Sequence, residues 1–370
     1  MPVVDADVHP LTPNGLPDLL PYMSDHWRRR LSMYRNWGVG RHPSPIGASR
    51  AGAPANFAAD ARPPAGGVPG SDPAFLREHL LDAHAIDACV LTPLEALYPG
   101  RFNYVPDAIH LVRAANDYFV NEWLPVDERF HLAIGVQAQD PLAAAEEIRR
   151  LAGTPRVVGV MVPFIDRLLG HPHYHPIYAA AVEAGLPIVL HPFGGEGEFQ
   201  GNATYPVAPP HTYTQMQALL PTLAMPNVAS LVFDGTFQTF PELKVVFTEY
   251  GATWLAAFLW RLDDKWRSLR VESPWLEELP STIVRQHIRF TTQPLEEGEQ
   301  PEHLGQLLAM MHADELLMFA SDYPHWDNDF PDFAFRTLPA SMVERISFRN
   351  ALDVYPIELP LPVEAETTSR

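Results

Sequence analysis

The chain has 370 residues and a formal net charge of −19, from 26 basic and 45 acidic residues. An acidic balance of this size argues against a nucleic acid or an anionic membrane surface as partner, because both carry negative charge. The single cysteine, Cys89, excludes an intrachain disulfide and a multi-cysteine metal site, and its apolar neighbours indicate a buried thiol. We find no secretory signal and no apolar run of about 18 residues, so we expect a soluble, cytoplasmic protein.

Short apolar runs alternate with helix-like segments along the whole chain, a pattern typical of parallel α/β architecture. No Gly-x-Gly-x-x-Gly follows the first run, which weakens a dinucleotide-binding interpretation. Eight strand–helix units predict one (β/α)8 TIM barrel. The predicted strands are Val3–Asp7, Ala88–Leu91, Leu132–Val136, Val157–Val162, Ile188–His191, Val245–Thr248, Ile288–Thr292 and Leu316–Ala320.

Three of the connecting segments carry clear helix signals. Apolar residues recur at helical spacing in Asp107–Trp123 and in Trp254–Leu269. A third helix is predicted over Leu142–Leu151, because Asp140 is a suitable N-cap and Pro141 suits the first helical position.

The segment Gly38–Gly70 is rich in Gly, Pro and Ala and predicts a long loop insertion after the first strand. Loops of this length are usually functional or disordered. Because the insertion follows a strand, it would rise from the barrel face where active sites are built, and we expect it to cover the mouth. We assign residues 1–358 to the barrel and 359–370 to a C-terminal tail.

Acidic and imidazole side chains stand at the ends of three predicted strands. Asp7 and His9 are two residues apart, which places both on one face of a strand. His191 ends the fifth strand and Asp322 follows the eighth. The C-terminal strand ends of a barrel converge on one mouth, so these four residues predict a single divalent-metal site. Their ligand types suit Zn²⁺, Mn²⁺ or Fe²⁺.

Several motifs together resemble the amidohydrolase superfamily. They are Asp5-Ala6-Asp7-Val8-His9, Pro176-Ile177-Tyr178, Leu186-Pro187-Ile188-Val189-Leu190-His191, Phe240-Pro241-Glu242-Leu243-Lys244-Val245-Val246-Phe247, Ser321-Asp322-Tyr323-Pro324-His325 and Asn350-Ala351. The resemblance runs from about Val3 to Tyr355 and is to amidohydrolase family 2, the branch with aminocarboxymuconate-semialdehyde decarboxylase and γ-resorcylate decarboxylase. It implies that Asp7, His9, His191 and Asp322 sit at the metal site and that Asp322 also moves a proton.

The sequence departs from the characterised decarboxylases of that branch at two strand ends. Asp7 stands where they tend to have His or Glu, and Glu249 stands where they have His at the end of strand six. Glu249 is a further metal ligand, a general base or an ion-pair partner, and the sequence leaves these three roles open. His325, three residues after Asp322, either contacts substrate or forms a structural hydrogen bond.

The favoured function is the metal-dependent, non-oxidative decarboxylation of a small aromatic or unsaturated carboxylic acid. In the mechanism that the resemblance implies, the metal chelates the carboxylate and a neighbouring oxygen, and Asp322 delivers a proton to the ring carbon. The alternative is hydrolysis of a C–N, C–O or C–C bond by metal-activated water, with Glu249 or Asp322 as base. A third hypothesis is a ligand-binding barrel without catalysis. The partner is expected to be a small-molecule substrate, and a homo-oligomer is left open.

Overall fold

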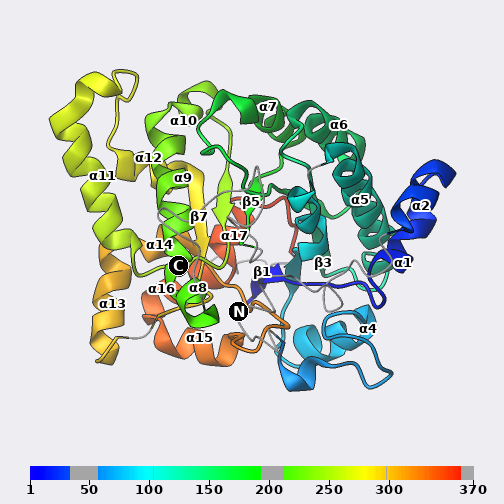
Figure 1. Cartoon of the computed structure of the whole chain (residues 1–370). Helices are drawn as coiled ribbons and strands as arrows, with labels where there is room; N and C mark the ends of the chain where they lie inside the picture. The colour runs from blue at the N-terminus through cyan, green and yellow to red at the C-terminus, as the bar shows by residue number, and fades with distance from the viewer. Residues whose placement is uncertain (34–56, 103, 193–211, 297, 360–370) are drawn as a thin grey trace, which may run out of the picture.

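Eight parallel strands form the centre of the molecule (Figure 1). The computed structural model describes residues 1–33, 57–102, 104–192, 212–296 and 298–359. The strands are hydrogen-bonded in chain order from β1 to β8, which confirms the predicted TIM barrel. Their bounds are β1 Val4–Val8, β2 Ala88–Leu91, β3 Phe130–Gly135, β4 Val157–Met161, β5 Ile188–Leu190, β6 Val245–Phe247, β7 Ile288–Thr291 and β8 Leu317–Met318.

Backbone hydrogen bonds join the segments of the first and last strands and so close the barrel. Ala6 N–H donates to the Phe319 carbonyl at 2.9 Å, and His9 N–H donates to the Tyr323 carbonyl at 2.8 Å. A parallel bridge between Val8 and Tyr323 continues this contact. Residues just after β1 and just after β8 therefore lie side by side at the mouth of the barrel.

Helices surround the strands on the outside (Figure 1). The predicted Asp140 cap is confirmed, because its carboxylate accepts a hydrogen bond from Ala143 N–H at 3.0 Å. Each predicted helix is found, with ends that differ by a few residues. After α5 the chain continues as a π-helix over Phe119–Trp123. The helices are α1 Leu16–Leu19, α2 Asp25–Leu31, α4 Pro73–Leu76, α5 Val105–Tyr118, α6 Pro141–Leu151, α7 His175–Ala184, α8 Tyr213–Leu219, α9 Pro221–Phe233, α10 Thr236–Thr239, α11 Leu255–Leu269, α12 Pro280–His287, α13 Pro301–Met310, α14 Ala313–Leu316, α15 Pro331–Thr337, α16 Ala340–Glu344 and α17 Asn350–Leu352.

The hydrophobic core has two layers because side chains alternate along each strand. One layer packs between strands and helices and contains, for example, Ile134 and the predicted buried thiol Cys89. The other fills the barrel interior with small and branched side chains such as Ala6 and Val246, and Tyr355 from the C-terminal segment packs against it. The barrel is thus a packed core and leaves only its mouth for chemistry.

The last part of the predicted insertion lies against the loop that follows β8. Residues 34–56 fall outside the described residues. The described residues resume at Phe57, which pairs with His325 in an antiparallel bridge. Ala58 N–H donates to the Pro324 carbonyl at 2.8 Å. Gly70 packs against β1 so closely that a Cβ there would lie 2.6 Å from the His9 carbonyl oxygen. The covering role of the insertion stays a prediction, as do the domain bounds, since residues 360–370 are also outside the described part.

One helical stretch is long and apolar enough to cross a membrane by length and composition alone. It is Thr214–Phe233, with 20 residues. An 18-residue window within it has a mean hydropathy of 1.3 and is 44% buried inside the molecule. From the sequence we expect no apolar run of this length, and the structure shows a helical stretch that reaches it. A core helix of a soluble protein passes the same test, and the buried side chains of α9, among them Leu223, Val228 and Leu231, pack into the core. The stretch is therefore weak evidence for a membrane span.

A buried carboxylate near the barrel mouth provides a test of stability against pH. Glu95 follows β2 and accepts hydrogen bonds from Thr12 N–H at 2.9 Å and from the Thr12 hydroxyl at 2.5 Å. Burial, which outweighs these two hydrogen bonds, raises the pKa of Glu95 from 4.5 to about 7. The unfolded chain then releases the Glu95 proton at lower pH than the folded protein does. The free energy of unfolding should therefore fall as pH rises from about 4.5 to about 7.

We expect Glu95→Gln to remove this part of the pH dependence, because its amide matches the neutral carboxyl group. One pKa unit corresponds to about 1.4 kcal/mol, so the wild type should lose about 3 kcal/mol more than the variant across that interval. Urea unfolding of both proteins at pH 4.5 and pH 7.5 measures the difference. Parallel pH profiles of the two proteins would contradict the raised pKa.

Candidate metal centre

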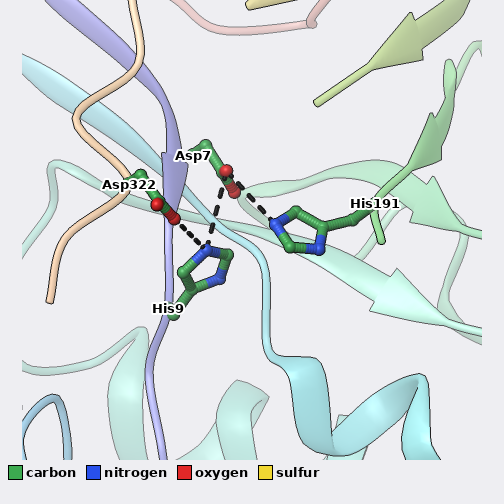
Figure 2. A group of neighbouring side chains, drawn as sticks. All are labelled: Asp7, His9, His191 and Asp322. Atoms are coloured by element: carbon green, nitrogen blue, oxygen red, sulfur yellow. Dashed lines mark hydrogen bonds and ion pairs between the residues drawn. The ribbon is translucent and has the colours of Figure 1, made fainter. Parts of the chain in front are cut away.

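The four residues predicted to form one site converge at the barrel mouth. Asp7 and His9 come from β1 and its end, His191 follows β5, and Asp322 follows β8. All four are buried, and one donor atom from each lies within 4.8 Å of the others. Figure 2 shows the four side chains pointing toward one another. The tertiary structure thus assembles the predicted group from three distant parts of the chain.

Each of the two imidazoles, His9 and His191, lies 3.5 Å or less from at least one carboxylate oxygen of Asp7 or Asp322. His9 Nε2 lies 2.7 Å from Asp322 Oδ1 and 3.6 Å from Asp7 Oδ2. His191 Nε2 lies 3.5 Å from the same Asp7 oxygen. Asp7 Oδ2 therefore faces both imidazoles, while Asp322 contacts only His9 of the pair.

Glu249 and His325 lie at the same centre. Glu249 Oε2 is 3.1 Å from His191 Nε2, and His325 Nδ1 is 2.7 Å from Asp322 Oδ1. His9, Glu249, Asp322 and His325 form a second buried group whose donor atoms also lie within 4.8 Å of one another. The prediction that these two residues face the mouth agrees with their position, while their roles stay open.

Backbone strain occurs at two of these acidic residues. Glu249 has φ 65° and Asp322 has φ 61°, in the left-handed region that non-glycine residues rarely adopt. This conformation costs about 1–2 kcal/mol per residue. Hydrogen bonds hold both residues there: Glu249 N–H donates to the Thr291 hydroxyl at 3.0 Å, and Asp322 N–H donates to the Asp7 carbonyl at 3.1 Å. Non-glycine residues held in such regions cluster at functional sites, where side-chain direction matters more than local stability.

Charge at the centre is concentrated, with three carboxylates and three imidazoles in one buried space. Burial lowers the pKa of His191, but the carboxylates of Asp7 and Glu249 outweigh burial and raise it well above its ordinary value. Burial raises the pKa of Asp322, but His325 and His9 outweigh burial and hold it well below its ordinary value. The carboxylates thus favour positive charge at this centre, and a divalent cation bound there would take the place of the proton on His191.

Two buried polar atoms support this fit of a cation to the residues present. Asp322 Oδ2 has no hydrogen-bond partner within the described part of the chain. His191 Nε2 has no hydrogen bond of good geometry there, although Glu249 Oε2 lies 3.1 Å away. Buried polar groups without partners are uncommon, and an ion is one explanation for them. Imidazole nitrogen and carboxylate oxygen are donors that suit Zn²⁺, Mn²⁺ and Fe²⁺. The donor set therefore fits a divalent transition-metal ion.

The sequence reasoning missed two residues at this centre. Thr92 directly follows β2 and contacts both Asp7 and His9, so the rule about strand ends could have found it. Phe57 stacks on His325 with ring centroids 5.7 Å apart and an interplanar angle of 18°. Nothing in the local sequence pattern marks Phe57, because its contact depends on where the end of the insertion packs.

A family model described as Amidohydrolase matches residues 4–357, nearly the whole chain. The chain belongs to this amidohydrolase family. The match spans β1 to the segment after α17 and so includes every strand end at the mouth. The resemblance inferred from the motifs is confirmed.

Curated relatives of this amidohydrolase are aromatic-acid decarboxylases by name. It is 24% identical to γ-resorcylate decarboxylase of Rhodococcus jostii over 271 residues, which cover 67% of this chain and 76% of the relative. It is 23% identical to γ-resorcylate decarboxylase of a Rhizobium species over 286 residues, 73% of this chain and 82% of the relative. These names agree with the branch that the sequence motifs indicate.

Solved structures share the fold across nearly their whole length. One is 5-carboxyvanillate decarboxylase of Novosphingobium aromaticivorans, complexed with manganese and 4-hydroxy-3-methoxy-5-nitrobenzoic acid. Its TM-score is 0.67 at 18% identity, with 95% of each chain covered. Another is a dihydroxybenzoic acid decarboxylase of a Polaromonas species with bound manganese and 2-nitroresorcinol. Its TM-score is 0.63 at 16% identity, with 95% of this chain and 96% of that chain covered.

Proposed function

We propose that this protein is a divalent-metal-dependent, non-oxidative decarboxylase of a small aromatic carboxylic acid. The observation that carries the proposal is the buried group of Asp7, His9, His191 and Asp322, whose donor atoms lie within 4.8 Å of one another. Family membership and the decarboxylase relatives support the reaction class. The manganese in the solved structures supports the metal class, with Mn²⁺, Zn²⁺ and Fe²⁺ as candidates. We further propose a cytoplasmic protein, and a homo-oligomer stays open.

In this proposal Asp7, His9, His191 and Asp322 hold the ion. When bound, a divalent ion supplies Lewis-acid chemistry by polarising an oxygen of the substrate and neutralising its carboxylate. The protein's own residues place the substrate and manage one proton. In the overall reaction the bond between ring carbon and carboxylate breaks, carbon dioxide leaves, and a proton takes its place on the ring carbon.

Asp322 and His325 are the proposed source of that proton. His325 Nδ1 and Asp322 Oδ1 are 2.7 Å apart, close enough for a proton to pass between them. Asp322 Oδ2, the other oxygen, is buried and has no hydrogen-bond partner among the residues that the structure describes. Phe57 stacks on His325 and helps to hold its ring in place. Because the pKa of Asp322 is low, Asp322 does not store the proton: His325 passes it to Asp322, and Asp322 relays it to the ring carbon.

Carbon dioxide release and metal dependence test this function together. We expect purified protein loaded with Mn²⁺ to release carbon dioxide from at least one ortho-hydroxylated benzoate, with 2,6-dihydroxybenzoate and 5-carboxyvanillate tested first. Removal of the metal with a chelator should abolish the release, and added Mn²⁺ should restore it. Asp322→Asn, which cannot carry the proton, should lower turnover on the order of 100-fold or more.

The same assay separates decarboxylation from the hydrolytic alternative. Hydrolysis would consume water and give a cleaved product without carbon dioxide. Product analysis by mass spectrometry distinguishes the two outcomes. Metal-loaded protein that releases no carbon dioxide from a broad panel of aromatic acids would contradict the proposal.

A further inference from the structure

Thr92 contacts both donor residues that β1 contributes to the centre. It directly follows β2 and is fully buried. Its hydroxyl forms a short hydrogen bond to Asp7 Oδ1 and lies 3.2 Å from His9 Nδ1. Its backbone carbonyl is 2.9 Å from the same His9 nitrogen. The residue that follows β2 thus contacts the carboxylate and the imidazole at the end of the neighbouring strand β1.

Hydrogen-bond chemistry determines how these contacts are oriented. A backbone carbonyl can only accept, so His9 Nδ1 must carry the hydrogen and donate it to Thr92. With Nδ1 turned to Thr92, Nε2 is the ring nitrogen left to bind a cation. It lies 2.7 Å from Asp322 Oδ1, a distance at which a hydrogen or a cation must lie between the two atoms. The hydroxyl of Thr92 has one proton, which it donates to the Asp7 carboxylate. With Oδ1 held in this way, Asp7 Oδ2 faces His9 and His191 at 3.6 and 3.5 Å.

We propose that Thr92 is a positioning residue of the metal centre. Its hydroxyl holds the Asp7 carboxylate with one oxygen turned toward the centre, and its carbonyl sets the tautomer of His9. The inference rests on the proposed function in one respect, that Asp7 and His9 are metal ligands. Hydrogen-bond partners of metal ligands typically contribute 10- to 100-fold to metal affinity, because they orient the ligand and fix its tautomer.

Thr248 offers a matched comparison within the same barrel. It directly follows β6, as Thr92 follows β2, and it is fully buried. Its hydroxyl has no hydrogen-bond partner in the described ranges, in contrast to that of Thr92. Replacing either threonine with valine removes a buried hydroxyl and keeps the shape. Only the change at Thr92 removes a contact to a proposed ligand.

The test measures Mn²⁺ affinity, with free Mn²⁺ followed by electron paramagnetic resonance in competition with a chelator. We expect Thr92→Val to weaken Mn²⁺ binding 10- to 100-fold. Thr92→Ser, which keeps the hydroxyl, should stay within about 3-fold of wild type, and Thr248→Val should bind as wild type does. Thermal unfolding of the metal-free proteins checks that each variant folds, and Thr92→Ala replaces Thr92→Val if the valine does not fit.

Three results would overturn the inference. The first is unchanged Mn²⁺ affinity in Thr92→Val, and the second is equal weakening of affinity in Thr92→Val and Thr248→Val. The third is Mn²⁺ affinity of Thr92→Ser as low as that of Thr92→Val. If wild-type protein binds no divalent ion at all, the proposed function fails first, so the two failures are distinguishable. A purely structural role of Thr92 would lower the unfolding temperature of the metal-free protein without changing Mn²⁺ affinity.

Discussion

His191→Ala should purify with little or no divalent metal, whereas the wild type should carry about one ion per chain. The imidazole is buried, and its Nε2 lies between the carboxylates of Asp7 and Glu249 at 3.5 and 3.1 Å. Its loss removes one of four proposed ligands and the imidazole that lies between the carboxylates of Asp7 and Glu249. Because even indirect partners of a ligand contribute 10- to 100-fold, we expect a loss of affinity on the order of 100-fold or more.

Metal content by mass spectrometry, after dialysis against metal-free buffer, measures this effect. His287→Ala is a matched control: His287 ends α12, stacks on Phe237, and belongs to neither group of donors at the mouth. His191→Gln, which keeps a polar side chain, should also lose metal and serves if the alanine variant unfolds. Equal, stoichiometric metal in wild type and in His191→Ala would show that His191 is not a ligand.

Glu249→Gln should abolish most of the turnover on a verified substrate. Glu249 is held in a left-handed backbone conformation with its carboxylate 3.1 Å from His191, so its position is specified at an energetic cost. The amide keeps the shape of the side chain and removes its charge. A general acid or base typically contributes 10²- to 10⁴-fold, so we expect turnover to fall roughly 100-fold or more.

Metal content measured on the same samples separates the three roles of Glu249. Lost turnover with metal retained supports proton transfer, and lost turnover with metal lost supports a ligand. Glu95→Gln changes another buried glutamate near the mouth that belongs to neither donor group, and it should keep both metal and turnover. Unchanged turnover in Glu249→Gln would mean that the residue is an ion-pair partner of His191 only.

Local sequence patterns determined the fold class and the membership of the centre. Apolar runs of strand length predicted all eight strands, because buried parallel strands need a continuous apolar sequence. Polar residues at the ends of those runs predicted Asp7, His9, His191 and Asp322 together. The i, i+2 spacing of the first pair was informative because strand geometry is regular over such short distances. Glu249 came from comparison with the family pattern at the end of strand six, and His325 from its position three residues after Asp322.

The tertiary structure alone decided how these residues contact one another. Closure of the barrel between β1 and β8 places Asp322 beside Asp7. The register of β2 beside β1 brings Thr92 into contact with both Asp7 and His9. The stacking of Phe57 on His325 depends on where the end of a long insertion packs. The hydrogen bonds of His9 to Thr92 and to Asp322 join residues 83 and 313 positions apart in the sequence. Local propensity carries no information over such separations, because strand register and loop packing are properties of the whole folded barrel.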